Sequence, residues 1–177
     1  MKYKPMLAYP VSDKPINYKG VVYMQPKLDG VRCLIQYERR TKPREDVVVA
    51  YSRNGKEWKN INHILAELKP FFQDFPNVVL DGELYNHDFK DDFESIISMV
   101  RKTKPTDEDR YISAQNVQFH CYDIIDTSKT YTQRRSFIVQ NLPIRDSIVG
   151  VFTQLVSSER EAKQVHKENL AKGYEGS

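Results

Sequence analysis

Hydrophobic and polar positions along this chain of 177 residues form short runs that predict strands and helices interleaved from end to end. Runs rich in β-branched and aromatic residues predict strands over residues 21–26, 31–38, 47–51, 78–80, 83–85, 117–125 and 148–156. Because Asp-Gly is a common turn dipeptide, we expect residues 21–38 to form a hairpin about Leu28-Asp29-Gly30. For the same reason, residues 78–85 should form a second pair about Asp81-Gly82.

Apolar residues at helical spacing predict four helices. The first spans residues 62–72, the second begins after a cap at Asp91 or Asp92, and the third spans residues 132–142. The fourth spans residues 158–172, with Ser157 or Ser158 as its N-cap and Gly173 as its stop signal. This alternation of strands and helices predicts an α+β protein.

Composition places the chain among ordinary globular proteins. Hydrophobic residues make up 40% and charged residues 29%, which excludes a disordered chain. No apolar run is long enough to span a bilayer, and the first residues lack the apolar core of a signal peptide. Cys33 and Cys121 both lie in apolar runs, so we expect two reduced, buried cysteines in a cytoplasmic protein.

The formal net charge of +3 is too small to indicate a nucleic-acid-binding protein by itself. Basic residues gather in three short stretches, at positions 39–44, 101–104 and 134–135. Such stretches form solvated faces or hold phosphates, and charge alone leaves both interpretations open.

Five short motifs contain residues suited to chemistry. They are Lys-Leu-Asp-Gly-Val-Arg at 27–32, Ser-Arg-Asn-Gly at 52–55, Asp-Gly-Glu at 81–83, Tyr-Asp at 122–123 and Glu-Gly at 175–176. Each alone is explained equally well by a turn or by core packing. Their order along the chain, from the lysine motif to the Glu-Gly pair, is more specific than any one of them.

In this order the motifs resemble those of the covalent nucleotidyltransferases, a group comprising DNA ligases, RNA ligases and mRNA capping enzymes. Pro-Met-Leu-Ala at residues 5–8 resembles a stretch typical of ATP-dependent DNA ligases. The resemblance implies a nucleotidyltransferase (ATP-grasp-like) fold of two antiparallel sheets flanked by helices, with the nucleotide in the groove between the sheets. It also implies a minimal ligase of viral or bacterial type.

The resemblance assigns roles residue by residue. Lys27 matches the nucleophile that takes AMP from ATP, and Glu175 matches the carboxylate that holds Mg²⁺ or Mn²⁺. The remaining matches are to nucleotide contacts: Gln25 to the adenine amino group, Arg32 and Arg53 to sugar and phosphate, Glu83 to the ribose hydroxyls and Tyr122 to the adenine ring. Asp29 is grouped with the nucleotide-binding residues and is expected to order the turn that carries Lys27.

The family has one further motif, a strand with two closely spaced lysines, and a small OB-fold domain, and neither is present in these 177 residues. We therefore expect residues 1–177 to be an adenylation domain truncated before those parts. Such a chain is expected to bind ATP but to adenylate itself slowly.

The leading hypothesis is an ATP-dependent DNA ligase that acts as a monomer on nicked duplex DNA, away from membranes, in the cytoplasm of a bacterial cell or a virus-infected host. An RNA ligase and a capping guanylyltransferase, which would use GTP, are the alternative enzymes. A nucleic-acid-binding module that has lost catalysis is an alternative of another class, as is a plain structural α+β domain.

Overall fold

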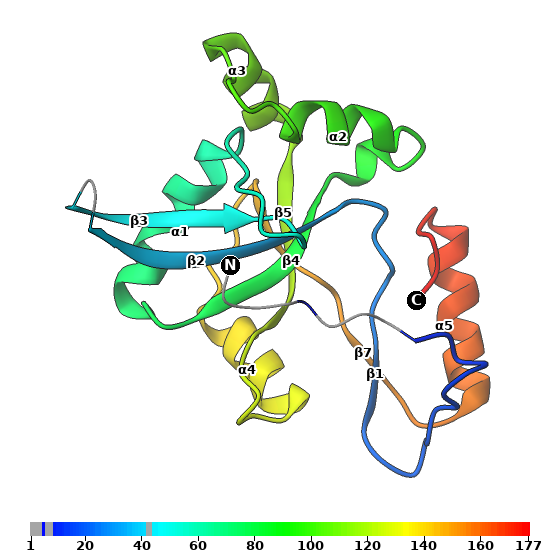
Figure 1. Ribbon diagram of the computed structural model, residues 1–177. Helices are drawn as coiled ribbons and strands as arrows, with labels where there is room; N and C mark the ends of the chain where they lie inside the picture. Colours follow the sequence, from blue (N-terminus) through cyan, green and yellow to red (C-terminus); the bar gives the residue numbers. More distant parts are fainter. Residues whose placement is uncertain (1–4, 6–8, 42–43) are drawn as a thin grey trace. The chain divides into compact units, whose positions relative to one another are not determined.

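The computed structural model describes Pro5 and residues 9–41 and 44–177. The chain divides into two compact units (Figure 1). The larger unit comprises residues 30–150, and the smaller unit joins the two ends of the chain, residues 1–29 and 151–177.

The larger unit is built on a five-stranded sheet with the order β3-β2-β4-β5-β6. Its strands are β2 (Val31–Thr41), β3 (Arg44–Tyr51), β4 (Val79–Tyr85), β5 (Gln118–Ile124) and β6 (Ile148–Gly150). Neighbouring strands are antiparallel except β5 and β6, which are parallel. The expectation of two purely antiparallel sheets is therefore wrong for this sheet, because the chain passes through α4 before β6 and re-enters in the same direction as β5.

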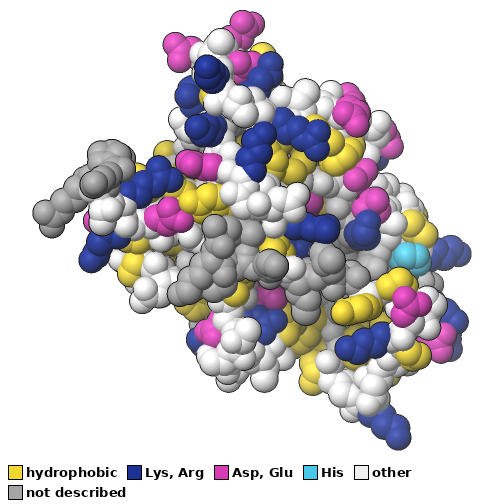
Figure 2. Space-filling view, viewed as in Figure 1, with side chains coloured by type: hydrophobic (Ala, Val, Ile, Leu, Met, Phe, Trp, Pro, Cys, Tyr) yellow, Lys and Arg dark blue, Asp and Glu magenta, His cyan; other side chains and the backbone are white. Residues whose placement is uncertain are grey.

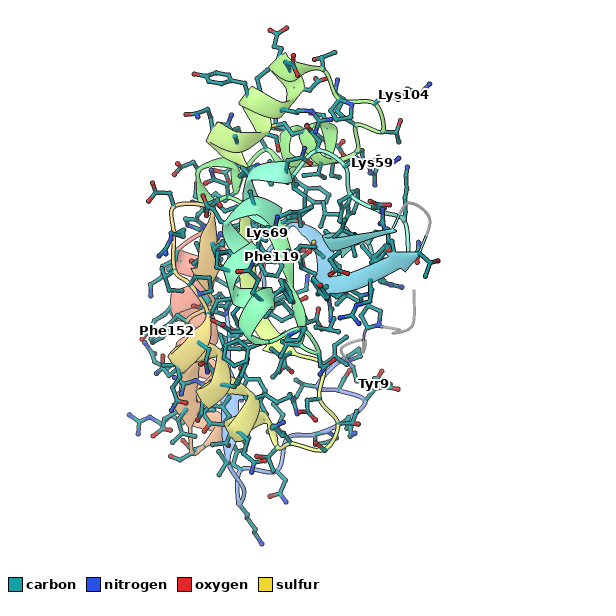
Figure 3. All side chains as sticks on the ribbon, turned by 90° about the vertical axis from the view of Figure 1, so that its left-hand side faces the viewer. Tyr9, Lys59, Lys69, Lys104, Phe119 and Phe152 are labelled. Atoms are coloured by element: carbon teal, nitrogen blue, oxygen red, sulfur yellow. The ribbon has the colours of Figure 1, made fainter. Side chains whose placement is uncertain are left out.

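Four helices and a 3₁₀ turn complete the larger unit: α1 (Asn62–Asp74), η1 (His87–Phe89), α2 (Phe93–Val100), α3 (Asp107–Asn116) and α4 (Tyr131–Asn141). In Figure 1, α2 and α3 lie at one end of β4 and β5, and α4 lies at the other. The buried residues of α1, among them Ile64 and Leu68, share one core with Leu80, Leu84 and Phe119 of the sheet. Figure 3 labels Phe119 within this core and the exposed Lys69 on the outer side of α1.

Two predicted strand pairs do not form, for the same reason. Residues 78–85 do not fold back at Asp81-Gly82 but form one strand, β4, buried between β2 and β5. The first predicted hairpin also does not form, because β2 pairs with β3 and β4. The Asp-Gly turn signal is local, whereas pairing along both edges of β4 supplies a full ladder of hydrogen bonds.

The smaller unit contains a two-stranded antiparallel sheet, β1 (Val22–Met24) with β7 (Gln154–Val156), and the helix α5 (Glu159–Ala171). Val156 pairs with Val22 and packs against Ala162 and Val165 of α5. The predicted strand 148–156 is therefore two short strands in two different sheets.

Helix boundaries follow the polar signals closely. Asp92 caps α2 and Ser158 caps α5, as predicted, and Gly173 adopts a φ of 87° just after α5. α3 was not predicted, because its sequence is polar and only Ser113 is buried along it. A capping box between Thr106 and Asp109 starts this helix instead. Within the described residues, no helix is both long and apolar enough to cross a membrane.

Candidate functional site

Lys27 lies in the smaller unit, where the chain next to β1 pairs with the end of the sequence. Its backbone N–H donates to the Gly176 carbonyl over 2.9 Å, and its carbonyl accepts from the Glu175 N–H over 3.2 Å. This bridge sets the Lys27 ammonium against the Glu175 carboxylate in an ion pair. The two side chains are 59% and 40% exposed, so both remain accessible to a ligand from solvent.

Asp29 belongs to the same charged group. Its pKa is raised, first by partial burial and then by the negative charge of Glu175, while Lys27 acts in the opposite direction. The Lys27 ammonium thus shares this charged group with two carboxylates, those of Asp29 and Glu175. Such a group can bind a cation in exchange for the lysine.

Gln25 is held by a hydrogen-bonded chain within the smaller unit. Its Nε2 donates to Thr153 Oγ1 over 3.0 Å, and that hydroxyl donates to the Val151 carbonyl over 3.1 Å. Thr153 is buried and stands one step beyond the last β1–β7 pair, Met24 with Gln154. No local sequence signal pointed to Thr153, since it becomes a neighbour of Gln25 only through strand pairing.

Arg32 and Asp81 form the main ion pair of the larger unit. The Arg32 Nε and Nη2 atoms donate to the two Asp81 carboxylate oxygens, each over 2.6 Å. Burial works against the charge of Arg32, but the hydrogen bond and charge of Asp81 outweigh it and raise the pKa of the guanidinium. Burial raises the pKa of Asp81, with Arg32 opposing. Asp81 belongs to the Asp-Gly-Glu motif, but no local pattern predicts that it anchors Arg32, which is 49 positions away.

Glu83 and Tyr122 lie beside this pair. Arg32 is opposite Glu83 in the β2–β4 register, and the Tyr122 hydroxyl donates to Glu83 Oε2 over 3.3 Å. The Arg32 guanidinium lies 5.1 Å from the centre of the Tyr122 ring. Burial, followed by the charges of Asp81 and Glu83, raises the pKa of Tyr122, so its hydroxyl stays a donor. Glu83 and Tyr122 lie inside β4 and β5, and Arg32 is the second residue of β2.

The motif glycines allow close approach of backbone in this unit. A Cβ on Gly30 would lie 2.5 Å from the Leu84 carbonyl oxygen and 2.6 Å from Glu83 Cγ. A Cβ on Gly82 would lie 2.4 Å from the His120 carbonyl oxygen and 2.6 Å from the Phe119 ring, beside a register shift at Asp81/Gly82. Neither glycine has a positive φ. Glycine is therefore required at these two positions because a side chain would not fit, and not because of a turn conformation.

Arg53 is exposed in the turn after β3, which closes through Gly55 N–H to the Ser52 carbonyl at 2.9 Å. Among the described residues, no hydrogen bond or ion pair joins Arg53 to Arg32, Glu83 or Tyr122. Met6, Leu7 and Ala8 of the N-terminal motif lie outside the described residues.

The basic stretches differ in their environment. Arg134 is bound to Asp123 through two hydrogen bonds of 2.8 and 2.9 Å, which tie α4 to β5. Arg101, Lys102 and Lys104 are exposed, and Figure 2 shows Lys and Arg side chains gathered over α2 and α3. Cys33 and Cys121 are buried free thiols, as expected.

In the smaller unit, Glu175 is the carboxylate paired with Lys27 that a divalent metal would meet, and its charge also acts on Asp29. Across the part of the chain that the structure describes, no group of three or more His, Cys, Asp and Glu side chains could hold a metal by itself. This arrangement fits Mg²⁺, which is commonly bound by one or two carboxylates together with substrate phosphates and water.

Several solved ligase structures share the fold. "Pmar-Lig_Pre." aligns with a TM-score of 0.70 and 21% identity over 96% of this chain and 40% of that one. A Lig E DNA ligase aligns with a TM-score of 0.68 and 20% identity, over 99% of this chain and 60% of that one. The Chlorella virus DNA ligase-adenylate aligns with a TM-score of 0.62 and 19% identity, over 98% of this chain and 57% of that one. An archaeal ATP-dependent RNA ligase aligns with a TM-score of 0.54 and 17% identity, over 88% of this chain and 38% of that one. The chain thus spans about 40 to 60% of the length of these proteins.

No curated protein sequence matches the chain. The family model described as the ATP dependent DNA ligase domain matches residues 5–177, which is nearly the entire sequence. The chain therefore belongs to the ATP-dependent DNA ligase domain family.

Proposed function

We propose that residues 1–177 are the adenylation domain of a DNA ligase, in which Lys27 accepts AMP from ATP. The observation that carries this proposal is the pairing of Lys27 with Glu175, two side chains 148 positions apart in the sequence. A lysine beside an exposed carboxylate, on a backbone bridge that fixes both, can act as a nucleophile next to a metal ligand.

The reaction begins when the Lys27 ammonium gives a proton to solvent water and its Nζ attacks the α-phosphorus of ATP. A P–N bond forms, the bond to the bridging oxygen breaks, and pyrophosphate leaves. Glu175 balances the ammonium before this step and offers its oxygens to a divalent cation when the nucleotide arrives. Mg²⁺, when bound, neutralises phosphate charge and favours the unprotonated amine. AMP then passes to the 5′-phosphate at a nick, and the 3′-hydroxyl displaces it to seal the strand.

Residues of the larger unit suit the recognition of a nucleoside. The buried Tyr122 offers a flat ring on which adenine can stack. Glu83 can accept hydrogen bonds from ribose hydroxyls. Arg32 can contact the sugar and phosphate and is held by Asp81, which we regard as a positioning residue. Gln25 would contact the adenine amino group, Asp29 would order the lysine segment and Arg53 would approach phosphate.

The test is incubation of the chain with ATP labelled at the α-phosphate and Mg²⁺, followed by denaturing electrophoresis. We expect covalent label on the unaltered chain and on Lys167→Ala, an exposed lysine of α5, and none on Lys27→Ala. Glu175→Gln should label at least tenfold more slowly, because it removes the metal-binding charge. Label that persists on Lys27→Ala would contradict the proposal. So would an unlabelled wild type when further motifs are supplied on a longer chain.

The family match favours nicked duplex DNA as the substrate. We propose further that the enzyme acts as a monomer in the cytoplasm of a bacterium or an infected host. The likeness to an archaeal RNA ligase keeps RNA ends as the second candidate. Sealing assays with matched DNA and RNA nicks separate the two, because only the preferred backbone should be joined. A capping guanylyltransferase would instead take label from GTP, and a module without catalysis would take none.

A further inference from the structure

We propose that Thr153 sets the choice of ATP over GTP by fixing which way the Gln25 amide faces. The inference rests on the proposed function, in which Gln25 contacts the adenine amino group. It adds a specificity-determining residue that no sequence motif contains.

The direction of each hydrogen bond follows from the atoms involved. The Val151 carbonyl can only accept, so the Thr153 hydroxyl must donate its single hydrogen over the 3.1 Å between them. Thr153 Oγ1 can then only accept from Gln25, and the atom 3.0 Å away must be the amide nitrogen Nε2. The carbonyl oxygen Oε1 therefore lies on the opposite side of the amide. The two orientations of a glutamine amide, related by exchange of Nε2 and Oε1, are otherwise nearly equivalent. Here the hydrogen bond to Thr153 selects one of them.

The fold keeps this arrangement in place. Gln25 and Thr153 continue the antiparallel register of Met24 with Gln154, so they stand directly opposite each other. Thr153 is buried, and a buried hydroxyl left without its partners costs free energy. Gln25 is two residues from Lys27, so the orientation is imposed close to the proposed nucleophile.

Orientation matters because the two purines differ at one position. Adenine presents an amino group, a donor, where guanine presents a carbonyl oxygen, an acceptor. Gln25 directed by Thr153 offers an acceptor, which suits adenine and repels guanine. A glutamate at position 25 would offer acceptors in either orientation and would need no such partner.

The experiment compares equilibrium affinities for ATP and GTP, measured by displacement of a fluorescent adenine nucleotide from the whole chain. Thr153→Val removes the hydroxyl at nearly constant volume, and Thr153→Ala removes it with less bulk. In both variants Gln25 can rotate and donate to guanine. We expect the ratio of ATP to GTP affinity to fall by about three- to tenfold, the value of one net hydrogen bond. Thr153→Ser, which keeps the hydroxyl, should restore the wild-type ratio.

The second comparison uses a Gln25→Glu background. A carboxylate accepts hydrogen bonds through both oxygens and has no N–H that could turn towards guanine. In this background, Thr153→Val should therefore change the ratio of ATP to GTP affinity by no more than about twofold. A role in stability alone would lower both affinities together and leave the ratio constant in either background.

An unchanged ratio in Thr153→Val and Thr153→Ala, or an equal fall in the Gln25→Glu background, would overturn the assignment of Thr153. Failure of the proposed function is a different result: nucleotide would bind with the expected ratios, but no label would form on Lys27.

Discussion

At the residue scale, the bidentate pair of Arg32 with Asp81 anchors the guanidinium that lies beside Tyr122 and Glu83. Their side chains are 24% and 10% exposed, so water screens the pair only in part. Arg32 also stacks over Tyr122 and lies opposite Glu83. Removing one partner therefore disturbs both the stability of the sheet and the nucleoside contacts proposed for it.

Asp81→Asn is expected to lower the free energy of unfolding by about 2 kcal/mol, because a partly buried guanidinium loses its countercharge and one acceptor. Urea denaturation measures the change. Asp46→Asn, at the exposed end of a 3.6 Å pair with Arg39, is the matched control and should have little measurable effect. Equal effects of the two substitutions would contradict the central place of Arg32 and Asp81.

His120 predicts a dependence of stability on pH. Burial, with a further contribution from the charge of His87, lowers the pKa of His120 from 6.5 to about 4. Between these values the unfolded chain binds a proton that the folded chain does not. Stability from this group is therefore complete above about pH 6.5 and is lost as the pH falls towards 4.

The loss from His120 should reach about 3 kcal/mol at pH 4. His120→Gln removes the titrating group, so the stability difference between wild type and variant should shrink by that amount from pH 7.5 to pH 4. The exposed His166→Gln variant serves as the control. A difference that stays constant with pH would show that the imidazole of His120 is as protonated in the folded chain as in the unfolded one.

At the scale of elements, β4 is the strand that connects the proposed nucleoside contacts. It carries Asp81 and Glu83 on one face and buries Leu80 and Leu84 on the other. Gly82 lies between them, where the Phe119 ring and the His120 carbonyl close the space that a side chain would need. The β4–β5 pairing thus depends on the absence of a single methyl group.

Gly82→Ala is expected to destabilise the chain by about 3 kcal/mol or more, since β5 must move to admit the methyl group. Thermal unfolding gives the change in Tm. Gly20→Ala is the control, because nothing lies within 4 Å of a Cβ at Gly20. A Gly82→Ala chain as stable as Gly20→Ala would refute the close packing described for β4.

At the scale of the whole molecule, the two units differ greatly in the size of their cores. The described core of the larger unit includes twenty fully or nearly fully buried residues, whereas that of the smaller unit includes three, Val156, Ala162 and Val165. Apolar burial is the main source of stability, so the smaller unit should open at a lower free energy. The segment that carries Lys27 belongs to this less stable unit.

Native-state hydrogen exchange should therefore show faster exchange for amides of β1 and β7 than for those of β4 and β5. The backbone N–H groups of Lys27 and Glu175 should exchange more slowly when ATP and Mg²⁺ are added, because a ligand that binds the folded state stabilises it against opening. Equal protection of both units without nucleotide would contradict the difference inferred from their cores.

Much of the fold was predictable from local sequence. The spacing of apolar residues placed α1, α4 and α5 within a few positions, and Asp92 and Ser158 were identified as caps. The predictions that failed concern strands and the partners they choose, and the helix α3 was missed because its sequence is polar. Asp81-Gly82 has the sequence of a turn, but strands on both sides pair with it and keep it extended.

Local sequence was enough to predict most of the helices and to reveal the family motifs and their order, because each of these depends on residues close together in the chain. The folded chain was needed to find that Lys27 pairs with Glu175, that Asp81 accepts two hydrogen bonds from Arg32 and that Gln25 donates to Thr153. These contacts join residues far apart in sequence. They form because strands pair with one another when the apolar faces of the sheets are buried. No local pattern encodes which distant strand will bury a given face, so these three contacts could be found only in the folded chain.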